Sequence, residues 1–378
     1  MENNILKTRF AYLDNVRSLV IILVITMHSA VTYSGLGDWY YKEGSEENLL
    51  LFELVFFAFY QSFLQAWFMG ILFFISGLMA AKALAKRGSF NFIKERLFRL
   101  GLPLLLYIFI ISPFIVFILL KMNPGYGFTE NFVLYLTNFW WLDGTGPLWF
   151  VETLLIFSII YAVLKKFFPN GIKINDINLK NIILTIILTA LFAFIIRLVF
   201  PIDTKFFNLQ FCNFAAYIVM FAIGILISEN NLLEKTTDEK NIKWIKLSQI
   251  IGVPLWLFII FFGGVYDGFN YYKGGLNWQS FAFALWEALM AIGFSMGLIA
   301  FFRKKVNTEN KFTGLMRDNT FGIYFFHAPI LVSITLALNS LIMLPILKFA
   351  VVAIITSVAC LVFSFLIRKI KPIGILLK

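Results

Sequence analysis

The sequence predicts an all-α integral membrane protein with about ten transmembrane helices in one bundle. The first observation is composition: 60% of the residues are hydrophobic and only 14% are charged, whereas an ordinary soluble domain carries about 25% charged residues. The second is that the apolar residues form continuous runs of about 20, which suits helices that cross a bilayer. A transmembrane barrel would instead show alternating segments of about ten residues. The third is the distribution of the basic residues along the chain.

The predicted spans follow one another through short polar or Pro/Gly-containing connections, without a tandem repeat. One transmembrane domain is therefore expected to fill residues 1–378. The run at 49–60, LLLFELVFFAFY, can extend the second span or form a separate helix along the membrane surface, and the sequence leaves both open. The spans are expected near residues 17–36, 61–84, 99–120, 147–165, 181–201, 212–228, 244–263, 280–302, 316–338 and 343–367.

The net charge of +11 is explained by membrane topology, and no nucleic acid partner is expected. If the N-terminus is cytoplasmic, most of the 32 Lys and Arg residues fall on the cytoplasmic side, as the positive-inside rule requires. We therefore expect cytoplasmic termini in a multi-pass protein of the cell (inner) membrane. The first apolar stretch is expected to remain as a span, because charged residues in and before it fit a cleaved signal peptide poorly. Cys212 and Cys360 lie in apolar segments without metal-type spacing, so neither a disulfide nor a metal site is predicted.

The first span, within YLDNVRSLVIILVITMH, holds Arg17 and His28. Their separation in an α-helix is a rise of about 16 Å and a rotation of about 20° beyond three full turns, so both face the same way. With Arg17 at the cytoplasmic surface, His28 lies near the middle of the hydrocarbon core, where burial favours the neutral, basic imidazole. Asp14 is expected to cap the helix start and to pair with Arg17. The helix N-terminus and Arg17 together favour a bound anion such as phosphate.

The second histidine, His327, lies in NTFGIYFFHAPIL within the ninth span. This span runs in the same direction as the first and reaches His327 after about eleven residues, so both histidines are expected at a similar depth. Each histidine can simply form a hydrogen bond to a neighbouring helix. Ionisable residues inside a membrane are costly, however, and a functional role is the default hypothesis.

These residues resemble a known family, the membrane-bound acyltransferase 3 family. Its signature is an arginine followed after ten residues by a histidine in the first span, which matches Arg17 and His28. The sequence FFISG at 73–77 and the basic pair Arg96 and Arg99 in KERLFRLGLP match a second feature. PLWF at 147–150 and IYFFHAPI at 323–330 are further matches. Within the family the chain is similar to the glucan biosynthesis protein C group, also at IIRLVFP, residues 195–201, which contains Arg197.

The resemblance implies an enzyme that moves an acyl group, acetyl or succinyl, from cytosolic acyl-coenzyme A to a hydroxyl of a carbohydrate or glycoconjugate on the extracytoplasmic side. It implies no permanently bound cofactor, since acyl-coenzyme A is the donor substrate. The predicted catalytic residues are His28, as base or transient acyl carrier, with Arg17 and Asp14. The coenzyme A phosphates are expected at Arg17, Lys94, Arg96 and Arg99. The acceptor or a secondary site is expected at Trp149, Glu152, Arg197, Tyr324 and His327.

Two other functions remain open at this stage. A transporter can use the intramembrane histidines with Glu152, Arg197 and Glu287 as a relay, although no inverted repeat is evident. A structural subunit of a polysaccharide exporter would need none of these residues. The arginines have simpler explanations as well: Arg96 and Arg99 can anchor a helix at the lipid headgroups, and Arg197 can extend toward the outer surface. Membrane lipids are expected partners, and a homodimer is left open.

Overall fold

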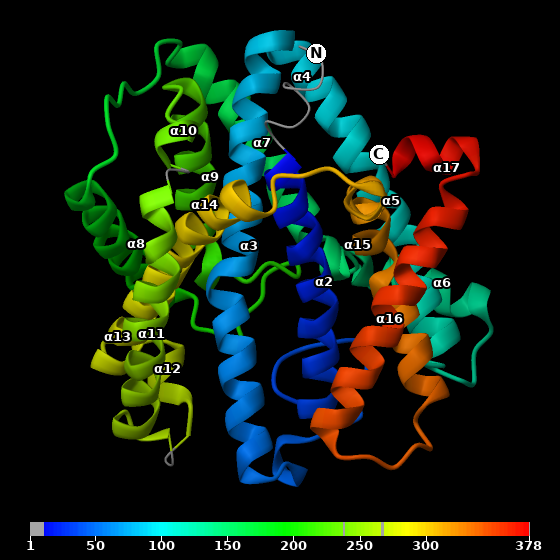
Figure 1. Cartoon of the computed structure of the whole chain (residues 1–378). Coiled ribbons are helices and arrows are strands. Elements are labelled where there is room, and N and C mark those ends of the chain that lie inside the picture. Colours follow the sequence, from blue (N-terminus) through cyan, green and yellow to red (C-terminus); the bar gives the residue numbers. More distant parts are fainter. Residues whose placement is uncertain (1–10, 237–238, 266–267, 378) are drawn as a thin grey trace. The chain divides into compact units, whose positions relative to one another are not determined.

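The structure is a computed structural model that describes residues 11–236, 239–265 and 268–377. In this part of the chain ten helices are long and apolar enough to cross a membrane, and Figure 1 shows them as the main elements of the fold. The labelled helices are α2 (Ala11–Ser34), α3 (Leu51–Arg87), α4 (Ser89–Arg96), α5 (Leu102–Leu106), α6 (Phe128–Thr137), α7 (Trp149–Phe167), α8 (Leu179–Val199), α9 (Phe214–Glu229), α10 (Leu233–Thr236), α11 (Lys243–Phe262), α12 (Asn270–Lys273), α13 (Trp278–Leu289), α14 (Ser295–Lys305), α15 (Lys311–Ala337), α16 (Pro345–Ile367) and α17 (Lys371–Leu376).

Each of the ten predicted spans corresponds to one of the ten helices that are long enough to cross a membrane. The open question about residues 49–60 is resolved, since α3 runs without interruption over 37 residues from Leu51. In the most apolar 18-residue stretches of the spans that contain α11 and α16, only 22% and 28% of the residues are buried within the protein. Helices of this hydropathy that expose most of their surface need a lipid environment, because the exposed apolar area would be unfavourable in water. The chain is therefore a multi-pass membrane protein.

Two compact units make up the chain. The first comprises Met1–Val16, Gln65–Lys94 and Ile156–Glu309, and the second comprises Arg17–Leu64, Glu95–Leu155 and Asn310–Lys378. Several long helices, such as α3 and α7, contribute residues to both units.

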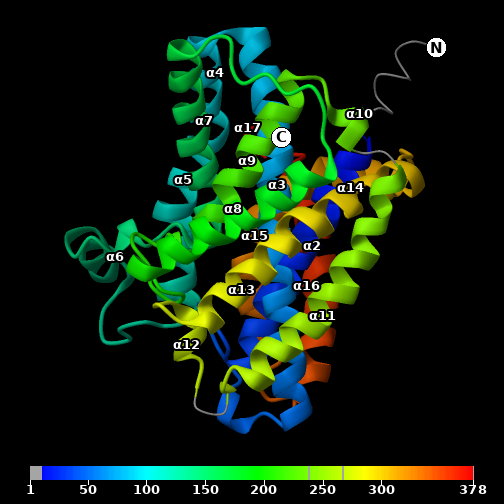
Figure 2. The same ribbon diagram turned by 90° about the vertical axis from the view of Figure 1, so that its left-hand side faces the viewer.

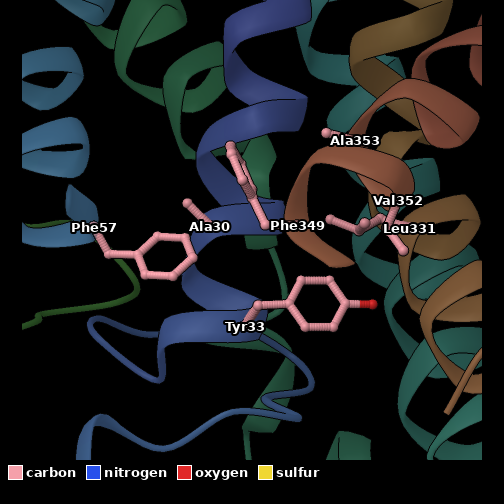
Figure 3. Packing of buried hydrophobic residues seen from close by; sticks show 7 residues of the cluster. All are labelled: Ala30, Tyr33, Phe57, Leu331, Phe349, Val352 and Ala353. Atoms are coloured by element: carbon pink, nitrogen blue, oxygen red, sulfur yellow. The ribbon is translucent and has the colours of Figure 1, made fainter. Parts of the chain in front are cut away.

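The second unit is centred on α2, α15 and α16: α15 packs along α16, and α2 is hydrogen-bonded to both (Figure 1). The Ser18 and Thr320 hydroxyls share a hydrogen bond of 3.0 Å between α2 and α15. Ser29 donates to the Phe349 carbonyl of α16 at 3.1 Å. Figure 3 shows the apolar cluster that joins these helices to α3, formed by Ala30, Tyr33, Phe57, Leu331, Phe349, Val352 and Ala353. Because Ala30 and Leu331 follow the two histidines within one helical turn, this cluster fixes the helices that carry them.

The third membrane span of the chain, Ser89–Leu119, departs from a regular α-helix in the part that belongs to the second unit. It contains three π-helical segments: η2 (Leu97–Gly101), η3 (Tyr107–Ile111) and η4 (Phe114–Leu119). A π-turn closes its hydrogen bond over five residues, one more than an α-turn, and such turns are rare and frequent at functional sites. Side chains along this span therefore do not keep the 3.6-residue period of a regular α-helix.

In the first unit, close helix crossings depend on small residues. A Cβ atom on Gly77 of α3 would collide with the Phe221 carbonyl of α9, and one on Gly224 would collide with the Phe74 carbonyl. The glycine that ends FFISG thus permits α3 and α9 to approach closely, a common arrangement in membrane proteins. Figure 2 shows α11 running alongside α13, and the Trp286 indole donates to the Gly252 carbonyl between them at 2.9 Å.

Candidate functional site

The structure brings the two histidines of the chain into ring contact within the second unit. The centroids of the His28 and His327 rings are 5.3 Å apart and their planes are inclined by 20°. His327 is fully buried, and His28 is half-buried. The sequence predicted a similar depth for both, and the parallel course of α2 and α15 produces the contact.

A third ring, Trp39, completes the stack. It lies 3.9 Å from the His28 ring with planes inclined by 16°, and 6.0 Å from the His327 ring. Trp39 belongs to the loop at 35–50, which begins with a turn at Gly35, where φ is +72°. The loop folds back on α2, because the backbone N–H groups of Glu43 and Gly44 both donate to the Thr32 carbonyl.

Trp39 was not among the residues predicted from the sequence. The available signal was an aromatic residue in a short loop with two glycines, Gly35 and Gly37, close to a span that carries a buried histidine. A glycine with positive φ allows the chain to reverse direction. This pattern favours a return of the loop toward the helix, but it does not indicate which side chain reaches the imidazole.

Polar atoms on all three rings are buried without a hydrogen-bond partner among the described residues: His28 Nδ1, Trp39 Nε1 and His327 Nε2. Each such atom costs about 1–3 kcal/mol of stability, and unsatisfied groups of this kind are uncommon in native structures. The geometry thus leaves three polar atoms of one stack without a hydrogen-bond partner in the described part of the chain.

The environment of His327 selects its tautomer. Its Nδ1 lies 2.5 Å from the Tyr324 carbonyl oxygen. Since a carbonyl only accepts hydrogen bonds, Nδ1 carries the hydrogen of the neutral ring. Nε2 therefore holds the free lone pair, which makes His327 a base with a fixed orientation.

Tyr324 connects two sequence motifs that are far apart in the chain. Its hydroxyl donates to the Pro147 carbonyl, in the 3-10 turn that precedes α7. The Phe150 ring meets the Tyr324 ring edge-on at 6.3 Å, and Trp149, the first residue of α7, meets Phe150 edge-on at 6.5 Å. PLWF and IYFFHAPI thus form one packed region next to His327. Glu152, one turn further along α7, has a buried Oε2 without a hydrogen-bond partner in the described part of the chain.

An open cleft of about 600 Å³ lies near the stack. It is lined by Tyr40, Tyr41, Leu119, Leu120, Lys121 and Leu336. The Tyr40 ring contacts the Trp39 ring edge-on at 5.3 Å, and its hydroxyl shares a hydrogen bond of 3.3 Å with the Tyr107 hydroxyl. Burial raises the pKa of Tyr40, so this hydroxyl remains protonated at neutral pH. A ligand in the cleft can therefore contact Tyr40, and Tyr40 in turn contacts Trp39, the ring that stacks on His28.

At the other end of α2, Arg17 is exposed and Asp14 is half-buried. The expectation that Asp14 caps the helix was wrong, because α2 already includes Ala11 and Asp14 lies within its first turn. An acidic side chain in this position still interacts favourably with the helix dipole. The uninterrupted helix from Arg17 to His28 keeps the two residues on one face, as the spacing predicted.

The basic residues of the third span are at or near the surface. Lys94 is exposed and belongs to the first unit, whereas Arg96 is half-buried and Arg99 exposed in the second. Arg99 Nε lies 3.0 Å from Glu95 Oε1. Solvent-exposed pairs of this kind contribute at most about 1 kcal/mol, so an anionic ligand can compete with Glu95 for Arg99.

Arg197 has a different environment within the first unit. Its guanidinium is 2.6 Å from the Glu287 carboxylate, and its Nε donates to the Cys212 carbonyl at 3.3 Å. The Phe283 ring lies 5.9 Å from its central carbon. Arg197 is 1% exposed, so it does not extend to the surface. Glu287, which matched no family motif, is thereby explained as the partner of a buried cation.

A small cavity of about 20 Å³ adjoins this ion pair, with Gln65 and Tyr217 in its wall. This volume holds about one water molecule. Arg197 Nη1 is buried without a hydrogen-bond partner among the described residues, and a water in the cavity would satisfy it.

Similarity to known proteins identifies the family of this chain. Residues 10–368 match the family described as an acyltransferase domain, Acyl_transf_3. No match was found among curated proteins or among solved structures. The matched segment includes the stacked histidines, the arginines of the third span and all ten long helices. Since nearly the whole sequence is covered, this chain belongs to the acyltransferase 3 family of membrane acyltransferases.

Proposed function

We propose that this protein transfers an acetyl or succinyl group from cytosolic acyl-coenzyme A to a hydroxyl of a carbohydrate or glycoconjugate on the extracytoplasmic side of the cell membrane. The observation that carries the proposal is the buried histidine stack, in which His327 Nε2 is an oriented base without a hydrogen-bond partner among the described residues. Acyl transfer to an alcohol requires such a base, because a neutral hydroxyl is a weak nucleophile. The resemblance to the glucan biosynthesis protein C group supports a glucan as the acceptor.

In the proposed reaction, His327 Nε2 accepts the proton of the acceptor hydroxyl while its oxygen attacks the thioester carbonyl carbon. The new C–O bond forms, and the carbonyl π electrons move to its oxygen. When the tetrahedral intermediate collapses, the C–S bond breaks and the thiolate of coenzyme A takes the proton from His327. His28, stacked on His327, either supports this proton transfer or carries the acyl group covalently for a first half-reaction.

The test is release of free thiol by purified protein in detergent. Acetyl- and succinyl-coenzyme A serve as donors, and gluco-oligosaccharides of graded length serve as acceptors. Thiol release that depends on the acceptor, together with an acylated sugar in mass spectrometry, is the expected result. If no pair of donor and acceptor releases thiol, and proteoliposomes that contain the protein accumulate an oligosaccharide, the transporter hypothesis replaces the proposed acyltransferase function.

The donor is proposed to bind through its phosphates at Arg17, Arg96 and Arg99. The double substitution Arg96→Ala/Arg99→Ala removes two charged contacts at the surface, each worth up to about 1 kcal/mol. The dissociation constant for acyl-coenzyme A, measured by calorimetry, is expected to rise roughly 10- to 30-fold. The matched control is Arg303→Ala/Lys305→Ala, which removes the same charge from the end of α14. Equal affinity in the two double variants would refute the assignment.

The acceptor is proposed to reach the histidines from the cleft lined by Tyr40, Tyr41 and Lys121. Sugars stack on aromatic faces, so Tyr41→Ala is expected to raise the KM for a gluco-oligosaccharide roughly tenfold, equivalent to about 1.4 kcal/mol. The KM for the acyl donor is expected to stay unchanged. Tyr271→Ala removes an exposed tyrosine of the first unit and serves as the control. A Tyr41 variant with an unchanged acceptor KM would exclude this route.

A further inference from the structure

The proposed reaction needs a hydrogen-bond donor in addition to the base His327. A negative charge develops on the carbonyl oxygen when the acceptor attacks the thioester, and hydrogen-bond donors aimed at that oxygen commonly supply the largest single stabilisation. Neutral imidazole with Nδ1 already bonded, as in His327, offers only an acceptor on its other nitrogen. The donor has to come from another side chain near the stack.

Three tyrosine hydroxyls near His327 and the cleft already take part in hydrogen bonds. The Tyr324 hydroxyl donates to the Pro147 carbonyl. The Tyr40 and Tyr107 hydroxyls are hydrogen-bonded to each other. In contrast, the Trp39 Nε1 hydrogen is buried and has no acceptor among the described residues. An indole N–H can only donate, so this group complements the lone pair of His327.

We infer that Trp39 Nε1–H is the oxyanion donor of the acyl transfer, a role that rests on the proposed function. The indole stacks on His28 at 3.9 Å and lies 6.0 Å from His327, so the indole N–H and the base belong to one stack of rings. The carbonyl oxygen of the thioester accepts a hydrogen bond from Trp39, and the hydroxyl of the acceptor donates one to His327. No proton leaves the indole during the reaction; its hydrogen bond strengthens as the oxyanion forms and weakens when the thiolate departs.

The loop holds Trp39 in a defined position, which an oxyanion donor requires because its dipole must be oriented before the reaction. The Glu43 and Gly44 N–H groups bond to the Thr32 carbonyl at 2.9 and 3.0 Å. The Glu43 carboxylate also pairs with Lys348 of α16, which is 4% exposed. A Cβ atom on Gly44 would collide with the Tyr33 carbonyl, so the loop fits closely against α2.

Three variants of Trp39 test this role. Trp39→Phe and replacement of Trp39 by 2-naphthylalanine keep an aromatic ring in the stack and remove the N–H, whereas Trp39→His keeps a planar ring with an N–H. With acetyl- or succinyl-coenzyme A and a gluco-oligosaccharide, the two variants without a donor are expected to lose kcat by roughly 100- to 1,000-fold. Both KM values are expected to stay within about threefold. Trp39→His is expected to recover at least about tenfold of the lost kcat.

The outcomes separate this inference from the proposed function. A naphthylalanine variant with wild-type kcat would overturn the donor role and leave the enzyme proposal intact. Equal losses in the His, Phe and naphthylalanine variants, with raised KM values, would show that Trp39 only fills space. If the wild-type protein releases no thiol with any donor and acceptor, both proposals fail together. Trp278→Phe, an exposed tryptophan of the first unit, is the control, and donor binding verifies that each variant is folded.

Discussion

Replacement of His327 by alanine is expected to lower kcat for acyl transfer about 1,000-fold, with little change in donor binding. A positioned general base contributes roughly 100- to 10,000-fold to a rate, and His327 is the imidazole whose tautomer and orientation the fold defines. The measurement is acceptor-dependent thiol release, combined with calorimetric binding of acyl-coenzyme A. A His327→Ala protein that turns over within threefold of wild type would exclude His327 as the base and transfer that role to His28.

His28→Ala provides the comparison, because it removes the other imidazole of the same stack. If His28 carries the acyl group, rapid denaturation of wild-type protein in detergent at neutral pH with radiolabelled acyl-coenzyme A is expected to trap label on the chain, and His28→Ala is expected to trap none. If transfer is direct, neither protein retains label. The His327→Ala variant then distinguishes the steps: it is expected to accumulate label only when a first half-reaction on His28 precedes transfer to the acceptor.

Arg197→Ala is expected to cause the largest loss of stability, about 3–5 kcal/mol. The guanidinium and the Glu287 carboxylate form a buried pair, and removal of one partner leaves the other charge buried without compensation. Thermal unfolding in detergent, followed by circular dichroism, is expected to show a clearly lower Tm. Arg197→Met/Glu287→Leu removes both charges and is expected to recover much of the loss, because neither charge remains.

A different result would change the role of Arg197. If Arg197→Ala keeps the wild-type Tm but raises the acceptor KM, then the arginine contacts substrate, as the resemblance at residues 195–201 implied. Equal destabilisation of the single and double variants would show that the guanidinium contributes through Cys212 and Phe283 and not through Glu287.

The ten spans were predictable because each requirement is local. A helix that crosses the hydrocarbon core needs about 20 apolar residues, and that length can be counted in the sequence. The contact between His28 and His327 was partly predictable for the same reason, since rise per residue determines depth. The neighbour relationship between their helices depends on packing contacts, such as Ser18 with Thr320, that the sequence does not reveal.

Other features required the three-dimensional structure. Trp39 reaches His28 through the conformation of a loop, and loop conformation depends on distant anchors such as Lys348. Pairing of Arg197 with Glu287 joins α8 to α13, far apart in the chain. The π-helical segments of the third span replace the regular α-helix that the sequence analysis assumed, because a local hydrogen-bond shift leaves no reliable signal in residue type.

The loop at 35–50 has a consequence for how this enzyme family can diversify. Its Gly35 turn and its bonds to Thr32 enclose Trp39, Tyr40 and Tyr41, and the two tyrosines line the cleft. Loops accept insertions and exchanges more readily than the helices that they connect. Exchange of the part of this loop that lines the cleft, with Trp39 retained, would therefore alter the walls of the cleft while His28, Trp39 and His327 stayed in place.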